Sequence, residues 1–116
     1  MTGLLLLFAF APVRPETVEL ELLRPDGKSF ALHRAENPAD GEQIIVPDGK
    51  RAWSIELHRH EYEGRLEICA DLSQWEADGL GQTLARPCVA ISGRDTPSAV
   101  VTAKADQVQI RLKVSR

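Results

Sequence analysis

The sequence predicts an all-β protein, an antiparallel sandwich or small barrel of about eight short strands. Apolar and polar residues alternate with a period of two in several segments. Turn residues (Gly, Pro, Asp and Asn) separate these segments roughly every 8–12 residues, a spacing typical of sandwiches. No long stretch has the 3.6-residue period of a helix. Together these patterns favour strands joined by tight turns around one core.

The clearest alternation lies in a hairpin between residues 53 and 72. Its arms, 53–62 and 65–72, flank a Glu63-Gly64 turn. On the first arm Trp53, Ile55 and Leu57 fall on one face, with polar residues between them. We therefore expect the hairpin to supply much of the core, with Trp53 as an aromatic anchor.

The first half of the chain is expected to form three further strands. Residues 17–24 alternate, the Pro25-Asp26-Gly27-Lys28 sequence predicts a tight turn, and residues 29–33 return. A polar loop covers 34–42, and a short strand follows at 43–46. The same four turn residues recur at 47–50, which predicts a second turn of similar chemistry.

The second half begins with a predicted helical turn near residues 73–78. Ser73 and Glu76 have the spacing of a capping box. Residues 82–92 read as a strand interrupted at Pro87, which places it at a sheet edge or bulge. Strands are also predicted at 98–104 and 107–114, so residues 13–116 form a single β-domain.

The length of the chain indicates a single domain, and its charge argues against some classes of partner. A chain of 116 residues is the size of one domain and can bury a real core. The net charge is −3, and the Lys and Arg residues are scattered singly. We therefore expect no nucleic-acid partner and no attraction to an anionic membrane surface.

The N-terminal segment, residues 1–12, has two interpretations. Leu4 to Ala11 is an unbroken apolar run, too short to span a bilayer, and Ala9-Phe10-Ala11 has the form of a signal-peptidase site. No Lys or Arg precedes the run, and Pro12 follows it. The segment is either a truncated signal peptide or a buried N-terminal segment. Export would make the protein periplasmic or secreted, with no membrane span in the mature domain; retention would make it cytoplasmic.

The two cysteines, Cys69 and Cys88, also leave two possibilities. They form a disulfide if the protein works in an oxidising compartment, or they are ordinary small, partly buried residues. Two cysteines alone do not define a disulfide framework.

A histidine pair is the main candidate for chemistry. His58 and His60 lie on one face of a predicted strand, Glu56 shares that face, and His33 belongs to a neighbouring strand. Such a set can hold zinc or copper. Alternatively, these side chains form the solvated face of an amphipathic strand.

Motifs of covalent and nucleotide chemistry are missing from the sequence. There is no G-x-S-x-G nucleophile elbow, and Gly79-Leu80-Gly81 lacks the third glycine of a dinucleotide-binding turn. We therefore predict a protein that is not an enzyme and needs no cofactor.

The segment LARPCVAISG at 84–93, followed by SAVVTA and VQIRLKV, resembles the β-hairpin segment of secretin-like bacterial envelope proteins. The matching positions are Leu84, Pro87, Val89, Ile91, Gly93 and Ala99, although the turn at 95–97 is longer than in that pattern. The resemblance implies a periplasmic, non-enzymatic β-domain.

The predicted function is therefore that of a binding or interaction module of a bacterial envelope, with a protein partner. It would act through its sheet surface or an exposed edge strand, with 82–92 as the candidate edge. The alternative is a metal-binding protein or small metalloenzyme that uses the strand-borne histidine pair.

Overall fold

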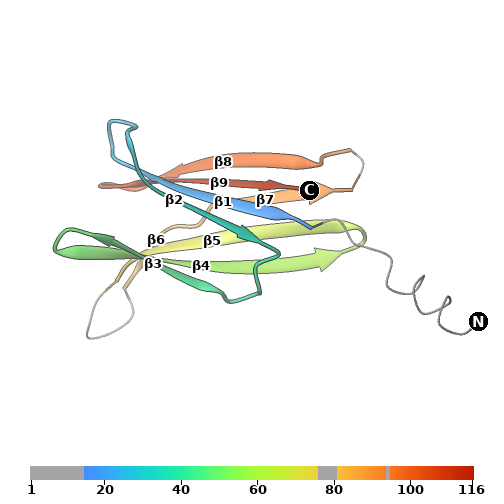
Figure 1. Ribbon diagram of the computed structural model, residues 1–116, viewed down its shortest axis with the longest axis horizontal. Coiled ribbons are helices and arrows are strands. Elements are labelled where there is room, and N and C mark those ends of the chain that lie inside the picture. The colour runs from blue at the N-terminus through green and yellow to red at the C-terminus, as the bar shows by residue number, and fades with distance from the viewer. Residues whose placement is uncertain (1–14, 76–80, 94) are drawn as a thin grey trace, which may run out of the picture.

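The computed structural model describes residues 15–75, 81–93 and 95–116 and confirms the all-β fold. Over these residues, nine strands form two antiparallel sheets that pack face to face as a sandwich (Figure 1). The strands are β1 (Thr17–Leu23), β2 (Ser29–Glu36), β3 (Gln43–Asp48), β4 (Arg51–Tyr62), β5 (Arg65–Trp75), β6 (Thr83–Ala85), β7 (Cys88–Ser92), β8 (Ser98–Lys104) and β9 (Gln109–Ser115).

Each sheet has a simple strand order. Sheet A runs β2-β1-β9-β8, and sheet B runs β3-β4-β5-β6, with β7 also paired to β5. The central strands of sheet A are therefore β1 and β9, which come from opposite ends of the described chain. Their pairing sets Leu20 directly opposite Leu112.

The core lies between the sheets, because each central strand directs its apolar residues inward. In β1 these are Val18, Leu20 and Leu22, all fully buried. The remaining buried residues come mainly from β4, β5, β7 and β9: Trp53, Ile55, Leu57, Leu66, Ile68, Ala70, Leu72, Val89, Ile91, Val108, Ile110, Leu112 and Val114.

The predicted central hairpin is confirmed as β4 and β5. Glu63 and Gly64 both have positive φ, 48° and 77°, which suits the two-residue turn that joins twisted antiparallel strands. Across the pair, Ile55 lies opposite Leu72 and Leu57 opposite Ala70, all facing the core. Trp53 is buried, as expected of an anchor.

The two identical four-residue turn sequences occupy different positions in their hairpins. Residues 25–28 form the connection between β1 and β2, where Gly27 has a φ of 92° and its N–H bonds to the carbonyl of Arg24. In the second copy, Pro47 and Asp48 still belong to β3, and only Gly49 and Lys50 form the turn. The shared sequence therefore does not reflect a repeated hairpin.

The predicted helical turn near 73–78 is wrong for its first three residues. Residues 73–75 continue β5, because Ser73 pairs with Ser54 of β4 and with Thr83 of β6. Sheet hydrogen bonds on both sides outweigh the local capping-box signal. Residues 76–78 lie outside the described residues.

Pro87 interrupts the strand predicted at 82–92, as expected. It separates β6 from β7, and its carbonyl accepts a hydrogen bond from the N–H of Ala70 in β5. Both pieces pair with β5 and lie at the edge of sheet B opposite β3.

The N-terminal segment, for which a signal peptide or a buried segment was predicted, lies outside the described residues. In the described part of the chain, no helix has the length and apolar character needed to cross a membrane.

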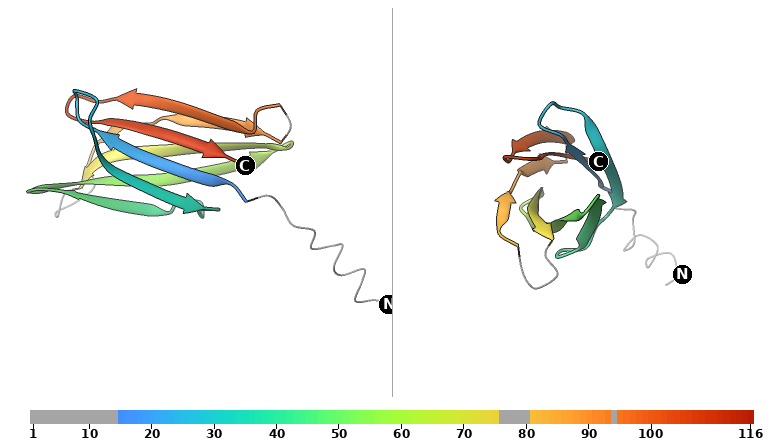
Figure 2. Two further views of the ribbon diagram at one scale, coloured as in Figure 1. Left: turned by 45° about the horizontal axis from the view of Figure 1, so that its top comes forward. Right: turned by 90° about the vertical axis from the view of Figure 1, so that its left-hand side faces the viewer.

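The sandwich has one closed side and one open side. On the closed side β7 packs against β8 and β9, and Ser92 and Thr96 form an isolated bridge (Figure 2). On the other side the edge strands are β2 of sheet A and β3 of sheet B, which are not paired with each other. The open side thus presents two free strand edges.

Two ion pairs tie the sheets together at the ends of this open side. At one end the guanidinium of Arg24 donates two hydrogen bonds to Asp48, with N–O distances of 2.8 and 2.9 Å. The indole N–H of Trp53 donates a third at 3.0 Å. Arg24 also stacks over Phe30, 3.9 Å from the ring centre. The guanidinium of Arg24 and the Trp53 N–H together lower the pKa of Asp48 to about 2.

At the other end, the buried carboxylate of Glu16 pairs with Arg59. The same guanidinium bonds to Glu61 at 2.8 Å and to the carbonyl of Pro38 at 3.0 Å. The hydrogen bond from Arg59, followed by its positive charge, lowers the pKa of Glu61. A charge buried at this depth requires such a partner, since removal of one member leaves the other unpaired.

The pKa of Asp48 predicts a defined pH dependence of stability. A carboxylate whose pKa is lowered in the folded state stabilises the protein above its unfolded pKa, near 3.8, and loses this contribution as the pH falls to about 2. We expect Asp48→Asn to lower the free energy of unfolding at pH 6, and the difference from wild type to shrink between pH 4 and pH 2. Urea denaturation of both proteins across this range measures it. A difference that does not vary with pH would contradict this role for Asp48.

Candidate functional site

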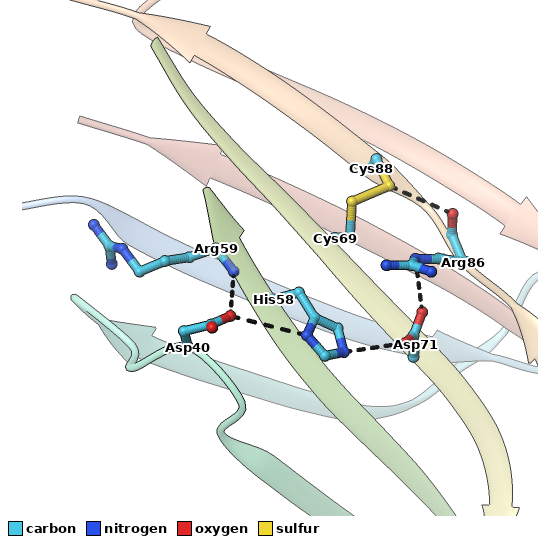
Figure 3. Close-up of a disulfide and its surroundings, with 7 residues drawn as sticks. All are labelled: Asp40, His58, Arg59, Cys69, Asp71, Arg86 and Cys88. Carbon is cyan, nitrogen blue, oxygen red and sulfur yellow. Dashed lines mark hydrogen bonds and ion pairs between the residues drawn. A yellow bond between two sulfur atoms is a disulfide. The ribbon is translucent and has the colours of Figure 1, made fainter. Parts of the chain in front are cut away.

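A polar cluster lies on the outer face of sheet B, around His58 (Figure 3). In the β4–β5 register His58 lies directly opposite Cys69, and in the β5–β7 register Cys69 lies opposite Cys88. Cys69 and Cys88 form a disulfide. One row across three strands therefore carries an imidazole and a disulfide side by side.

Carboxylates flank both ring nitrogens of His58. Its Nε2 lies 3.1 Å from Oδ2 of Asp71, and its Nδ1 lies 3.8 Å from Oδ1 of Asp40. Asp71 in turn lies 3.1 Å from Nε of Arg86 through its other oxygen, so a chain of polar contacts runs from Asp40 through His58 and Asp71 to Arg86 (Figure 3). The Asp40 oxygen also accepts the backbone N–H of Arg59 at 2.9 Å, which holds the loop after β2 against β4.

The chemistry available to this cluster is limited. An imidazole oriented by a carboxylate can act as a general base when a nucleophile lies within hydrogen-bond reach. The only thiols of the chain, Cys69 and Cys88, are joined to each other, and no free cysteine remains. The cluster is thus an imidazole flanked by carboxylates on a partly exposed surface, with a disulfide and no free thiol beside it.

The metal-site residues predicted from the sequence are only partly brought together. Glu56 lies near His58, with 3.7 Å between its Oε1 and Nε2 of the imidazole. His60 points to the same face but stacks with Tyr62, with 5.0 Å between ring centres. His33 lies on sheet A opposite Leu20, so it faces the space between the sheets rather than the outer face of sheet B.

Zinc or copper was the cofactor of the alternative, metal-binding interpretation of this set. Within 15–75, 81–93 and 95–116, no group of three or more His, Cys, Asp and Glu side chains is arranged to hold a metal ion.

The second candidate site is an apolar groove on the open side of the sandwich. It has a volume of about 210 Å³ and runs between the edge strands β2 and β3. Leu32 and Ile45 stand at its rim, 69% and 43% exposed. The lining contains no carboxylate, lysine or arginine: Leu20, Leu22, Ala31, Leu32, His33, Ile44, Ile45, Val46, Pro47 and Ile55.

The hydrogen-bond pattern shows which backbone groups of β3 face the groove. The N–H of Leu57 donates to the carbonyl of Glu42 at 2.8 Å, so these two residues are a hydrogen-bonded pair. The pairing of β3 with β4 continues from there without a shift, beginning with Gln43 opposite Glu56. Because bonding residues alternate along an antiparallel pair, the even-numbered residues of β3 bond to β4. The backbone groups of Gln43, Ile45 and Pro47 therefore point to the free edge.

Pro47 fits this arrangement, since proline has no N–H and is tolerated in a sheet only where no bond is needed. The free edge of β3 consequently offers the N–H groups of Gln43 and Ile45, and the carbonyls of all three residues. The sequence carried a signal for this edge, an uncharged QIIV run followed directly by Pro47, which was not recognised as such.

Asp40, Asp71 and Arg86 were also missed as neighbours of His58. Asp71 faces Glu56 in the β4–β5 register, so the outward alternation of both strands would have placed it beside the histidine face. Asp40 and Arg86 come from segments outside the strands, and no pattern places them there.

No protein-family model, curated protein or solved structure matches this chain.

The disulfide predicts a measurable contribution to stability. It closes a loop with a sequence separation of 19 residues and fixes β7 beside β5. Restricting the unfolded chain by a loop of this length is worth about 3 kcal/mol. We expect the double variant Cys69→Ala, Cys88→Ala to lose about that much free energy of unfolding in urea.

Wild-type protein treated with dithiothreitol is the matched comparison, and the double variant should not respond to the reductant. Equal stability of wild type and double variant would contradict a structural role for the bond.

Proposed function

We propose that this protein is a non-enzymatic binding module of a bacterial envelope that receives a strand of a protein partner at the free edge of β3. One observation carries the proposal: an apolar, uncharged groove lies between two strand edges whose backbone groups are unpaired within the described sheets. A strand added to such an edge gains affinity from main-chain hydrogen bonds and specificity from side chains that enter the groove.

The geometry of the groove supports an extended ligand rather than a small molecule. Its floor comes from the core residues Leu20, Leu22 and Ile55, and its long walls are the edge strands themselves. Along β3 the lining ends at Pro47, directly before the Asp48 that pairs with Arg24. Alternate side chains of an incoming strand would rest on this floor, while the other side chains would face solvent.

The lack of charge in the lining supports an apolar sequence for the incoming strand. A charged side chain directed into the groove would lose its hydration without gaining a partner. The edge predicted from the sequence, at 82–92, is the less favourable place, because β7 packs against β8 and β9 and is fixed to β5 by the disulfide.

The proposed compartment is the periplasm or the exterior of the cell. The Cys69–Cys88 disulfide supports an oxidising environment. The apolar run Leu4 to Ala11 and the resemblance of residues 84–114 to secretin-like envelope proteins agree with it.

Site-specific photo-crosslinking in the producing cell tests the function. We expect benzoylphenylalanine at Ile45 to give a covalent protein adduct, because an added strand would lie beside this residue. The same group at Val100 is the matched control, since Val100 is similarly exposed, at 59%, but lies on β8 at the far edge of the other sheet. Equal adducts at both positions, or none at Ile45, would contradict strand addition at β3.

A metal-binding protein or small metalloenzyme is the alternative function, and the carboxylates around His58 are the observation that favours it. Zinc or copper bound only by the folded state would raise the melting temperature. The alternative fails if neither ion shifts the wild-type melting temperature, or if His58→Ala with His60→Ala retains the shift.

A further inference from the structure

We propose that the strand received by the β3 edge is β3 of a second copy of this chain, in an antiparallel pair centred on Ile45. This inference rests on the proposed function, because it names the partner of the same site. It makes the protein a symmetric dimer in which the two copies of sheet B form one continuous sheet. In a twofold arrangement each copy presents the same residues to the other.

The inventory of donors and acceptors at this edge suits such a pair. With Ile45 opposite Ile45 of the second copy, the N–H of each donates to the carbonyl of the other. In the same register Gln43 lies opposite Pro47 of the second copy. The N–H of Gln43 then donates to the proline carbonyl. The carbonyl of Gln43 is the group left without a donor in this pair, because the proline opposite it has no N–H. The missing N–H of Pro47 therefore costs the pair little.

Side chains also match in this register. On the groove side Ile44 lies opposite Val46 of the second copy, and both are apolar and partly buried. On the outer side Ile45 meets Ile45, and Gln43 meets Pro47, so the central positions of the pair carry no charge. At its two ends Glu42 lies opposite Asp48 of the second copy, and the charge of that Asp48 is already paired with Arg24. A shift of the axis to Ile44 would instead place Glu42 opposite Val46, where the carboxylate has no partner.

The other edges are less suited to self-pairing. Asn37 N donates to Glu16 O, so alternation directs the backbone of Arg34 and Glu36 to the free edge of β2. Charged residues on an edge are a common device against strand addition. The β8 edge lies on the closed side, beside β7. The outward residues of β3 are all uncharged; β6, at the other edge of sheet B, is also uncharged but has only three residues, Thr83–Ala85.

The two exposed apolar residues of the open side gain a role in this dimer. Ile45 lies on the twofold axis, and Leu32 stands across the same groove on β2. A second copy paired with β3 would cover Ile45 and lie beside the groove whose rim both residues form.

The oligomeric state of the full chain tests the proposal. We expect the wild type to be a dimer by light scattering during size-exclusion chromatography at 100 μM. The Ile45→Lys variant should have a dimer dissociation constant at least tenfold higher, because the twofold axis would bring two ammonium groups together. Val100→Lys adds the same charge at a similarly exposed position on the opposite edge and should leave the dimer intact. Circular dichroism melts confirm that both variants fold. A wild-type monomer, or a dimer that Ile45→Lys does not weaken, overturns the proposal.

Oxidative crosslinking tests the register. The pair centred on Ile45 brings two Cys side chains from Ile45→Cys within disulfide reach, about 5.5 Å between Cα atoms. In the same dimer the two copies of Gln43→Cys stand roughly 13 Å apart along the strands, too far for a disulfide. A covalent dimer of the first variant and not of the second is the expected result. Crosslinking of Gln43→Cys alone, or of neither variant, overturns the register.

Failure of the dimer can be told apart from failure of strand addition. A photo-adduct at Ile45 with the mass of two copies supports both proposals. An adduct at Ile45 of any other mass overturns the self-pairing and keeps the binding function.

Discussion

The packing of one face of each sheet against the other is the constraint on which the rest of the structure depends. Sheet A contributes the inward residues of β1 and β9, and sheet B contributes those of β4 and β5. The paired Leu20 and Leu112 of sheet A and Trp53 of sheet B belong to this one core. A sandwich of two open sheets inevitably leaves strand edges. Burying the faces therefore decides where the edges fall, and the edges decide where another chain can attach.

The two sides of the sandwich handle their edges differently. On one side β7 crosses close to β8 and β9, and the Cys69–Cys88 bond keeps it there, so that the edges protect each other. On the other side the described residues form an ion pair at each end. The Arg24–Asp48 pair fixes one end and the Glu16–Arg59 pair the other. Between these ties lie the free edge of β3 and the groove beside it, so the ion pairs of the fold frame its candidate binding surface.

Alternation made most of this fold predictable from the sequence, because a period of two fixes both the strand and its buried face. Trp53 and the hairpin of β4 and β5 follow from it directly. The helical turn at Ser73 was wrong because a local cap signal says nothing about pairing partners distant in sequence, and Thr83 completes the sheet there. The identical turn tetrapeptides likewise form different turns, since the pairing register selects which residues turn.

The site was harder to predict than the fold. The histidine pattern correctly placed His58 and His60 on one outer face, but His33 lies on the other sheet, and no periodicity reveals how two sheets stack. The groove depends on the same stacking, because it exists only where β2 and β3 end their sheets together. The uncharged QIIV run followed by Pro47 was the local sign that this strand lies at an edge.

Amide hydrogen exchange at the β3 edge tests the central claim, that these backbone groups bond to another strand, most directly. The amides of Gln43 and Ile45 have no bonding partner within the described sheets, whereas those of the even-numbered residues bond to β4. Residue-resolved exchange of the full chain at 5 μM and 500 μM should show protection of Gln43 and Ile45 that rises with concentration, with little change at Val46. Rapid exchange of both amides at both concentrations would contradict the account.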